Sequence, residues 1–340
     1  MDSRVFRIGL LAAIFISIPV LLSVNFPPDE CYWAGIVSLT IPLFVLLNFG
    51  GVLYFLVMRS KWLVVPGLIL IASFPVYSKL VSLRGDSNQM SSTLSVLSFN
   101  VDSFKHFSRT NSNDFEINKQ SFENWAKARQ LDILCLQEMV ELGNEPYIMK
   151  EYEKASSLKI TKDGDHLGLF IFSKFPIIAE GAIEFAENSY NRLMWVDIVA
   201  FADTIRIANV HLMSYDFNNG TLGQNLRAMR TGVMARSWHT KLINQFVRNS
   251  PYPVLLSGDF NEAPYSYSYR SITSLLQDTF LSSGAGFDYT YVFLGLPFRI
   301  DHVFIDPQLR ASHFQIIHGL DEWSNHSPVS VQIVLPGPGE

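Results

Sequence analysis

Acidic, amide and histidine side chains recur at the ends of apolar segments along most of the chain. They are Asn100, Asp102, Glu138, His211, Asp259, Asn261, Asp301, Asn325 and His326. In open α/β sheets, ligands bind beyond the strand ends, where loops bring polar groups together on a rigid frame. We therefore expect these residues to meet at one functional site.

The residue types in this set indicate metal-assisted phosphoryl chemistry. Mg²⁺ takes oxygen ligands, usually one or two carboxylates together with water and a substrate phosphate. Glu138 with Asp102 supplies such oxygens. A histidine held by a carboxylate, as His326 by Asp301, is the arrangement that activates water or balances charge in phosphoryl transfer.

Each of these residues also has a plain structural explanation when it is taken singly. An asparagine after a strand, such as Asn100, is often a turn former, and His211 suits a hydrogen-bonded core histidine. Independent turn residues need not follow so many apolar strands in this order. The set as a whole therefore favours a functional site.

The segments that must position these residues alternate between short β runs and helices. Runs of continuous or alternating apolar residues are typical of strands, several of them of the buried type. These runs are residues 93–100, 132–138, 168–173, 193–201, 204–212, 253–260, 299–306 and 329–335. Residues 118–131 and 226–247 have the spacing of amphipathic helices. Many strands with helices between them predict an α/β sandwich.

Six sequence blocks, in order, resemble a known superfamily. The blocks are LSFNVD, CLQE, NVHL, GDFNEAP, RIDHVF and NHSPV. Together they resemble the endonuclease/exonuclease/phosphatase superfamily, which includes deoxyribonuclease I, abasic-site endonucleases, neutral sphingomyelinases and inositol polyphosphate 5-phosphatases. The resemblance covers residues 93–335. It implies a four-layer α/β sandwich, with two mixed sheets between helices, and a metal-dependent attack of water on a phosphoester.

The resemblance also implies roles for the residues around the metal and the water. Glu138 would be the main metal ligand, with Asn100 and Asp102 beside it, and the metal would be Mg²⁺, with Mn²⁺ as an alternative. Asp259 would orient or deprotonate the attacking water, and Asn261 would hold a phosphate oxygen.

The histidines and arginines complete the implied site. His326 would act as a base or as a transition-state stabiliser, with Asp301 fixing its tautomer, and His211 would contact the scissile phosphate. Whether Asp259 or His326 is the base stays open. Arg192 and Arg299 are candidates for substrate binding, because a guanidinium group offers bidentate donors to phosphate, although a structural salt bridge explains each equally well.

The final block departs from the family pattern. It reads Ser324-Asn325-His326, where the family usually has Ser-Asp-His. Losing that carboxylate removes a negative charge near the metal. Two functions therefore compete: a metal-dependent phosphoester hydrolase, acting on nucleic acid, a lipid headgroup or a small phosphorylated metabolite, and a catalytically weak or inactive membrane-tethered binding module.

Composition divides the chain into a membrane part and a globular part. Hydrophobic residues make up 48% and charged residues 17% of the sequence, which excludes a disordered chain. Three uncharged runs, over residues 8–26, 32–58 and 62–78, are each about as long as a bilayer-spanning helix. They predict transmembrane helices over about 8–26, 32–58 and 62–83, the last of which extends past Lys79 if that side chain snorkels. A linker over 84–92 and a catalytic domain over 93–340 follow. A cleaved signal peptide is the alternative explanation of the first run.

The charges at the ends of the runs predict an orientation. Arg4, Arg7, Arg59 and Lys61 would lie in the cytoplasm by the positive-inside rule. Three crossings then place the catalytic domain on the far side, which for a bacterial inner membrane is the periplasm. The expected partners are the lipid bilayer and a phosphoester substrate, with no obligate protein partner.

Charge argues against a protein that coats polynucleotide. The chain has 26 basic and 31 acidic residues, and residues 1–83 hold five basic and three acidic ones. The remainder therefore has 21 basic and 28 acidic residues, a net charge of −7. Such a domain attracts a phosphate backbone weakly. Cys31 and Cys135 are the only cysteines, which excludes a disulfide framework and a zinc site built from cysteines.

Overall fold

The computed structural model describes residues 3–85, 93–105, 112–141, 148–162, 164–186, 189–201, 203–215 and 221–335. Within the predicted linker, residues 86–92 lie outside the described residues. The chain divides into two compact units. The first comprises Met1–Val81, Ser214–Thr240 and Pro264–Ser271, and the second comprises Ser82–Met213, Lys241–Ala263 and Ile272–Glu340.

The first unit holds the apolar helices. They are α1 (Ser3–Leu22), α2 (Tyr32–Ser38), α3 (Ile41–Val57) and α4 (Val64–Tyr77), with short 3-10 turns at Ser23–Asn25, Lys61–Leu63 and Ser78–Leu80. By length and composition, two helical segments of the described chain can cross a membrane, Arg4–Asn25 and Lys61–Leu80. The number rises to three if α2 and α3, which meet at a 53° bend, count as one span.

The bend corrects the expectation of one continuous helix over 32–58. Pro42 falls in the first turn of α3. A proline lacks the backbone N–H, and the first turn of a helix is the place where that loss costs least. The helix therefore ends at Ser38 and a new one begins at Ile41.

Close contacts between α1 and α3 use small and polar side chains. The Asn48 amide donates to Ser17 Oγ at 3.0 Å and to the Phe44 carbonyl oxygen at 2.7 Å. A Cβ atom at Gly51 would lie 2.8 Å from Ile14 Cδ1. Membrane helices pair in this way, because lipid tails give apolar side chains no incentive to gather.

The first unit also includes part of α6 (Leu222–Arg248). Ser237 Oγ donates to Asp29 Oδ1 at 2.6 Å, and the Arg230 guanidinium lies 4.6 Å from the centroid of the Tyr32 ring. The loop and helix that follow α1 therefore contact a helix whose sequence belongs to the predicted catalytic domain.

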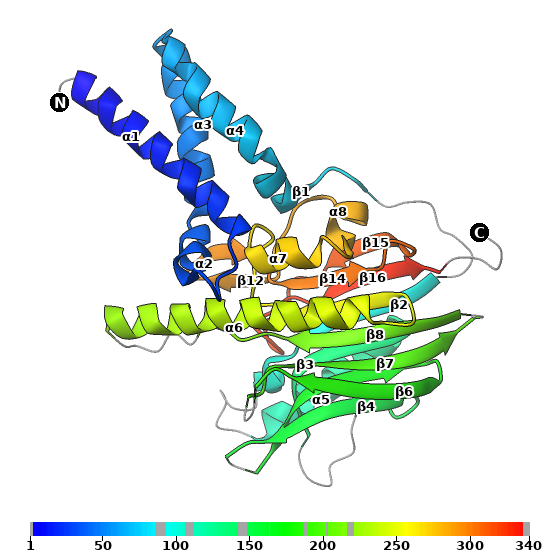
Figure 1. Ribbon diagram of the computed structural model, residues 1–340. Coiled ribbons are helices and arrows are strands. Elements are labelled where there is room, and N and C mark those ends of the chain that lie inside the picture. The colour runs from blue at the N-terminus through cyan, green and yellow to red at the C-terminus, as the bar shows by residue number, and fades with distance from the viewer. Residues whose placement is uncertain are drawn as a thin grey trace. The chain divides into compact units, whose positions relative to one another are not determined.

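Two six-stranded mixed sheets form the second unit (Figure 1). One has the order β15 (Arg310–Ile316), β16 (Val329–Val334), β2 (Thr93–Asn100), β3 (Ile133–Glu141), β5 (His166–Ser173), β4 (Glu153–Ile160). The other has the order β10 (Gln277–Asp278), β14 (Asp301–Ile305), β9 (Val254–Asp259), β8 (Asp203–His211), β7 (Arg192–Ala200), β6 (Ile177–Glu184). In each sheet one central pair is parallel, β2 with β3 and β8 with β9, and the other pairs are antiparallel.

Shorter elements complete the described chain. They are β1 (Val81–Ser82), a 3-10 turn at Asp102–Lys105, α5 (Ser112–Ala128), α7 (Tyr267–Ile272), α8 (Thr279–Ser283), β11 (Gly286–Phe287), β12 (Tyr291–Phe293) and β13 (Leu296–Phe298).

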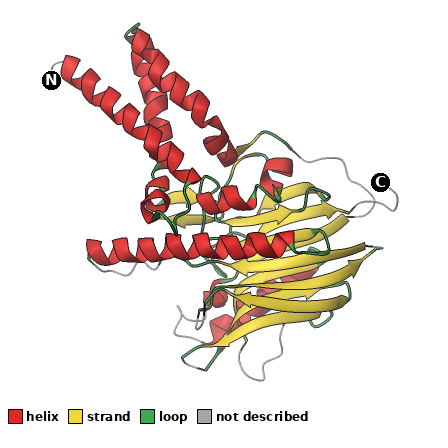
Figure 2. Cartoon of the chain, viewed as in Figure 1, coloured by secondary structure: helices red, strands yellow, loops and turns green. Residues whose placement is uncertain are grey.

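The core lies between the two sheets. Apolar side chains from both sheets, among them Val96, Ile133, Ile207 and Val303, form one buried cluster. A second cluster joins the outer face of the first sheet to α5 through Phe99 and neighbours. Alternate residues along the strands of the first sheet point toward one cluster and then the other, as expected for a sheet that is covered on both faces. The expected α/β sandwich of two mixed sheets and covering helices is confirmed (Figure 2).

A buried polar network crosses the apolar core. Gln137 of β3 donates to Asn209 Oδ1 of β8 at 2.7 Å, and the Asn209 amide donates to the carbonyl oxygens of Leu136 and Phe170, each at 2.9 Å. Both side chains are fully buried. Because a buried amide without partners is costly, this network favours one register of sheet on sheet.

His302 of β14 is held neutral by its neighbours. Arg299 Nη1, which can only donate, lies 2.8 Å from His302 Nδ1, and His302 Nε2 donates to the Glu262 carbonyl oxygen at 2.9 Å. Burial, followed by repulsion from Arg299, lowers the pKa of His302 to about 3. Asp278 pairs with the same guanidinium at 2.9 Å.

The lowered pKa of His302 predicts acid sensitivity. The folded pKa lies below the ordinary value of 6.5, so the stability from His302 is present above pH 6.5 and is lost as the pH falls toward 3. In this window we expect the free energy of unfolding of the wild type to fall by up to about 1.4 kcal/mol per pH unit. Thermal unfolding at a series of pH values should give a smaller slope of unfolding free energy against pH for His302→Gln, because glutamine does not titrate. Equal slopes would contradict the assignment.

Gly258, directly before Asp259, generates a second prediction. Its φ is +141°, and a Cβ atom there would lie 2.0 Å from the Val210 carbonyl oxygen on β8. We expect Gly258→Ala to lower the free energy of unfolding by roughly 3 kcal/mol or more, because the chain must relieve both the backbone strain and the clash. Gly164→Ala is the control, since Gly164 also has positive φ but open space around it. Equal losses of thermal stability would show that the clash is absent.

Candidate active site

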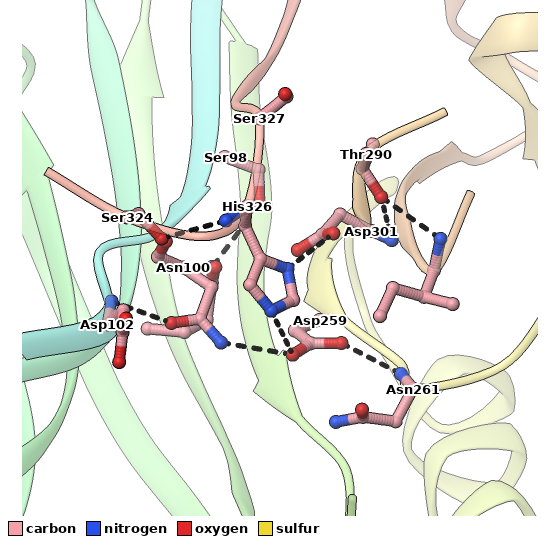
Figure 3. Close-up of polar contacts among 12 residues, drawn as sticks. Ser98, Asn100, Asp102, Asp259, Asn261, Thr290, Asp301, Ser324, His326 and Ser327 are labelled. Atoms are coloured by element: carbon pink, nitrogen blue, oxygen red, sulfur yellow. Dashed lines mark hydrogen bonds and ion pairs between the residues drawn. The ribbon is translucent and has the colours of Figure 1, made fainter. Parts of the chain in front are cut away.

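Six of the expected side chains converge at one edge of the two sheets. Asn100 ends β2, Glu138 lies in β3, and Asp259 ends β9. His211 ends β8 opposite Asp259, and Asp301 opens β14, also opposite Asp259. His326 comes from the loop before β16. Figure 3 shows Asn100, Asp259, Asp301 and His326 pointing toward one another from both sheets.

A β-bulge directs Glu138 into the site. In the pairing of β3 with β5, Leu136 faces Phe170 but Met139 faces Gly168, so β3 carries one extra residue. Glu138 lies in this bulge with φ +51°. Bulges change the direction of a side chain and are frequent beside active sites. Without the bulge, strict alternation along β3 would point Glu138 to the same face of the sheet as Leu136.

Asp259 accepts hydrogen bonds on both carboxylate oxygens. The Asn100 amide donates to Asp259 Oδ2 at 3.0 Å and to Glu138 Oε1 at 2.9 Å. The backbone N–H of Asn261 donates to Asp259 Oδ1 at 2.8 Å (Figure 3). The Asn100 amide group therefore joins the two carboxylates, and these bonds fix the orientation of Asp259.

His326 is paired with Asp301. Its Nδ1–H donates to Asp301 Oδ2 at 2.9 Å, and its Nε2 lies 3.9 Å from Asp259 Oδ2. Burial alone would lower the pKa of His326, but the negative charges of Asp301, Asp259 and Glu138 together raise it to about 10. These charges favour the protonated ring, and Asp301 fixes the orientation of its Nδ1–H.

Ser324 orders the loop that carries His326. Its hydroxyl donates to the Asn100 carbonyl oxygen at 2.7 Å and accepts from the His326 backbone N–H at 3.0 Å. Asn325, the residue that departs from the family pattern, is exposed between these two buried neighbours.

Among the residues that the structure describes, two groups of side chains could hold a metal ion. Glu138, His211 and Asp259 form one, and Asp259, Asp301 and His326 form the other, with the ligand atoms of each group within 4.8 Å of one another. His211 Nε2 lies 3.4 Å from Glu138 Oε1 and 3.8 Å from Asp259 Oδ2. Asp259 belongs to both groups, so a metal ion bound near Glu138 and the Asp301–His326 pair would share this carboxylate.

Asn100, Asp102 and Asn261 make hydrogen bonds within the protein at this site. Asn100 Oδ1 accepts from the Asp102 backbone N–H at 3.0 Å, so its amide nitrogen faces the carboxylates. The Asn261 side-chain amide donates to the Leu212 carbonyl oxygen at 3.0 Å. The roles of Asn100 and Asp102 as metal ligands and of Asn261 as a phosphate donor stay predictions.

Both candidate arginines have structural partners. Arg192 is 1% exposed and donates to Ser157 Oγ at 3.0 Å and to the Leu158 carbonyl oxygen at 3.3 Å. Arg299 is 4% exposed, between Asp278 and His302. Substrate binding by Arg192 and Arg299 stays a prediction, for which these contacts give no support.

Tyr291 of β12 belongs to the site but was not expected from the sequence. Its ring lies 4.8 Å from the His326 ring, at 35° between the planes, and the two backbones form a β-bridge. Burial and the charges of Asp259, Asp102 and Glu138 raise the pKa of Tyr291. A short strand of mixed residues ten positions before Asp301 carried no periodicity or charge that could have identified it.

Family comparison matches two parts of the chain. The model described as "Endonuclease/Exonuclease/phosphatase family" matches residues 97–322, and a model of a domain of unknown function matches residues 3–80. No curated protein matches the chain.

Solved structures share the fold of more than 70% of the chain. An endonuclease/exonuclease/phosphatase from Bacteroides vulgatus has a TM-score of 0.55 at 18% identity, with 72% of this chain and 100% of that chain covered. TDP2 of D. rerio, complexed with a single-strand DNA product, has a TM-score of 0.55 at 17% identity, with coverage of 72% and 100%. The human Nocturnin catalytic domain with bound sulfate has a TM-score of 0.54 at 15% identity, with coverage of 74% and 97%.

The fold, the converging acids and histidines, and the family match over residues 97–322 agree with one another. That match covers more than half of the chain. The chain therefore belongs to the Endonuclease/Exonuclease/phosphatase family and is a metal-dependent phosphoric ester hydrolase of that type.

Proposed function

We propose that this chain is a membrane-anchored phosphoester hydrolase in which water attacks phosphorus with the help of Mg²⁺ held at Glu138. The observation that carries the proposal is the sharing of Asp259 between the two groups of candidate ligands, Glu138 with His211 and Asp301 with His326. One carboxylate thereby lies beside both a cation site and a charged histidine. Phosphoryl transfer needs both kinds of positive charge close to the reacting phosphate.

The donor set fits a divalent cation. Glu138, Asp259 and Asp301 bring three carboxylates together, and Asp301 Oδ1 is buried without a hydrogen-bond partner in the described part of the chain. Such an excess of negative charge is costly unless a cation balances it. Oxygen ligands favour Mg²⁺ or Mn²⁺, and a nitrogen ligand from His211 would favour Mn²⁺. When bound, the ion polarises a phosphoryl oxygen and neutralises developing charge.

The protein groups divide the remaining chemistry between Asp259 and His326. Asp259 is fixed by Asn100 and by the backbone N–H of Asn261, so its Oδ2 is positioned to orient a water and accept its proton. The charges of Asp301, Asp259 and Glu138 raise the pKa of His326, which makes the ring a better carrier of positive charge than a proton acceptor. We therefore assign proton acceptance to Asp259 and stabilisation of the pentacoordinate phosphate to His326, with Asp301 fixing the ring. His211 lies on β8 and Asp301 on β14, the two strands that flank β9 and its Asp259. We assign His211 a contact with the metal or the phosphate.

The alternative of a binding module without turnover depends on Asn325 alone. That side chain is exposed, whereas the Asp301–His326 pair and the carboxylates are in place. The hydrolase is therefore the better supported function.

Anchoring places this activity at a membrane. Two helical segments of the described chain are long and apolar enough to cross a bilayer. The positive charges of Arg4, Arg7, Arg59 and Lys61 favour a cytoplasmic location for the start of α1 and for the turn after α3. With α2 and α3 counted as one span, the hydrolase domain lies on the extracytoplasmic side, which is the periplasm if the membrane is a bacterial inner membrane.

Substitution of Glu138 tests the metal assignment. Glu138→Gln keeps an oxygen to accept from the Asn100 amide but cannot neutralise a divalent ion. We expect hydrolysis of bis-p-nitrophenyl phosphate to fall by roughly two orders of magnitude or more, with thermal unfolding unchanged. Mn²⁺ binding, measured by calorimetry, should weaken in parallel.

Glu141→Gln is the matched control for this experiment. Glu141 lies on the same strand but pairs with Lys154 at 2.8 Å. It should keep wild-type turnover and Mn²⁺ affinity. Near wild-type turnover of Glu138→Gln would refute the metal assignment, and hydrolysis by the wild type that survives EDTA would refute metal dependence.

A reporter fused after Glu340 tests the orientation. We expect alkaline phosphatase at this position to be active and green fluorescent protein to be dark, because each reporter works on one side of the membrane only. Arg59→Glu combined with Lys61→Glu, which removes the cations between α3 and α4, should reduce the asymmetry. An inactive phosphatase beside a fluorescent fusion would reverse the proposed orientation.

A further inference from the structure

The hairpin formed by β12 and β13 exposes an apolar tip. Leu294 is 86% exposed, Leu296 59% and Val292 48%. The whole segment Tyr291–Phe298 carries no charged residue. Monomeric soluble domains seldom gather large apolar side chains on a projecting turn, and such a patch usually marks an interaction site.

The turn of the hairpin is an unfavourable place for leucine. Leu294 and Gly295 form the two-residue connection, with φ of +49° and +78°. Hairpin turns of this kind favour asparagine or glycine at both positions, because a bulky side chain carries backbone strain there. Leu294 at the tip therefore carries backbone strain and exposes apolar surface to water. Contact with an apolar phase would offset these two costs.

The base of the hairpin is attached to the catalytic histidine. The Tyr291 ring lies against His326, and the Ser327 backbone N–H donates to the Thr290 carbonyl oxygen at 2.8 Å. Thr290 Oγ1 accepts from the backbone N–H of Asp301 at 3.1 Å. Leu294 is three residues from Tyr291, so the tip lies within about 10 Å of that ring. Whatever the tip contacts is therefore presented next to the site.

The composition of the tip discriminates between classes of partner. Single-stranded nucleic acid is bound by cations along its backbone and by aromatic rings that stack on bases. The tip residues 292–297 offer no cation, and the chain beyond residue 83 has a net charge of −7 from 21 basic and 28 acidic residues. Leucine and valine side chains instead suit the boundary between lipid headgroups and acyl chains. Two apolar helices of the described chain are long enough to hold it at such a surface.

We propose that the hairpin tip, Val292–Pro297, inserts into the surface of a lipid bilayer and that the site acts on phosphoesters of lipid headgroups. The second part of this inference rests on the proposed hydrolase function, and the first part does not. The hairpin thereby determines specificity, because it places the site at headgroup depth.

Insertion is measured without using activity. The full chain with Cys31→Ser and Leu294→Cys, labelled with an environment-sensitive fluorophore, is reconstituted into vesicles of phosphatidylcholine and phosphatidylglycerol. Cys135 is fully buried, and burial raises its pKa to about 12, so it does not compete for label. We expect a blue shift and quenching by lipids that carry a shallow quencher. The control is Ile160→Cys on β4, where the native isoleucine is 67% exposed. A label at position 294 that reports water, as at position 160, overturns the proposal.

Specificity is measured as a ratio of activities. Leu294→Asn combined with Leu296→Gln keeps a residue suited to the turn and removes the apolar tip. We expect the rate on vesicle phospholipid, divided by the rate on bis-p-nitrophenyl phosphate, to fall by about tenfold, which corresponds to about 1.4 kcal/mol. Ile160→Gln should keep the ratio.

The outcomes separate the two proposals. If the wild type hydrolyses neither substrate, the hydrolase function fails, while a buried label at position 294 still supports insertion. If the wild type cleaves bis-p-nitrophenyl phosphate and single-stranded DNA but not phospholipid, the hydrolase function stands and the lipid proposal is overturned. An unchanged ratio in the tip variant also overturns it.

Discussion

The site depends on one hydrogen bond between two sheets, from the Asn100 amide to the Asp259 carboxylate. Asn100 belongs to the first sheet and Asp259 to the second, so this bond forms only when the sheets pack in a single register. The apolar core does not specify that register by itself, because dispersion contacts tolerate small shifts. The buried Gln137–Asn209 pair supplies the missing constraint, since a slip would break the bond from Gln137 and the two bonds that Asn209 donates across the core. Stability and function thus draw on the same polar contacts.

Charge is the second constraint, and it opposes the first. Bringing Glu138, Asp259 and Asp301 together in a mostly buried place raises the free energy of the folded chain unless cations are present. His326 is one such cation, and its raised pKa records how much negative charge surrounds it. The left-handed backbone at Glu138 adds strain at the same place. The fold supports this arrangement because the acids lie at strand ends, where a rigid apolar sandwich holds them and water and ions still reach them.

Sequence patterns could predict the buried strands and the polar residues that follow them. The run over 93–100 coincides with β2, and the six converging side chains were all named from motifs. The outer strands β4 and β6 carried too few buried positions to be recognised, because an edge strand with solvent on one face needs little apolar character. Arg192 and Arg299 show a deeper limit. Their residue type suits phosphate binding, but only three-dimensional packing reveals that Ser157 and Asp278 engage them. The Gln137–Asn209 contact and Tyr291 also depend on pairings far apart in sequence, which one sequence does not encode in any local pattern.

The proposed membrane anchor would change what the catalytic domain itself must recognise. A soluble enzyme with a net charge of −7 in its catalytic part would need strong local contacts to collect a phosphorylated, and therefore anionic, substrate. A tether replaces part of that affinity with effective concentration, because a substrate confined to the same surface is never far from the site. The domain then needs only enough contact to orient the phosphoester. With such a tether, both candidate arginines can serve the fold, and the hydrophobic tip at Leu294 is more useful beside the site than another positive charge would be.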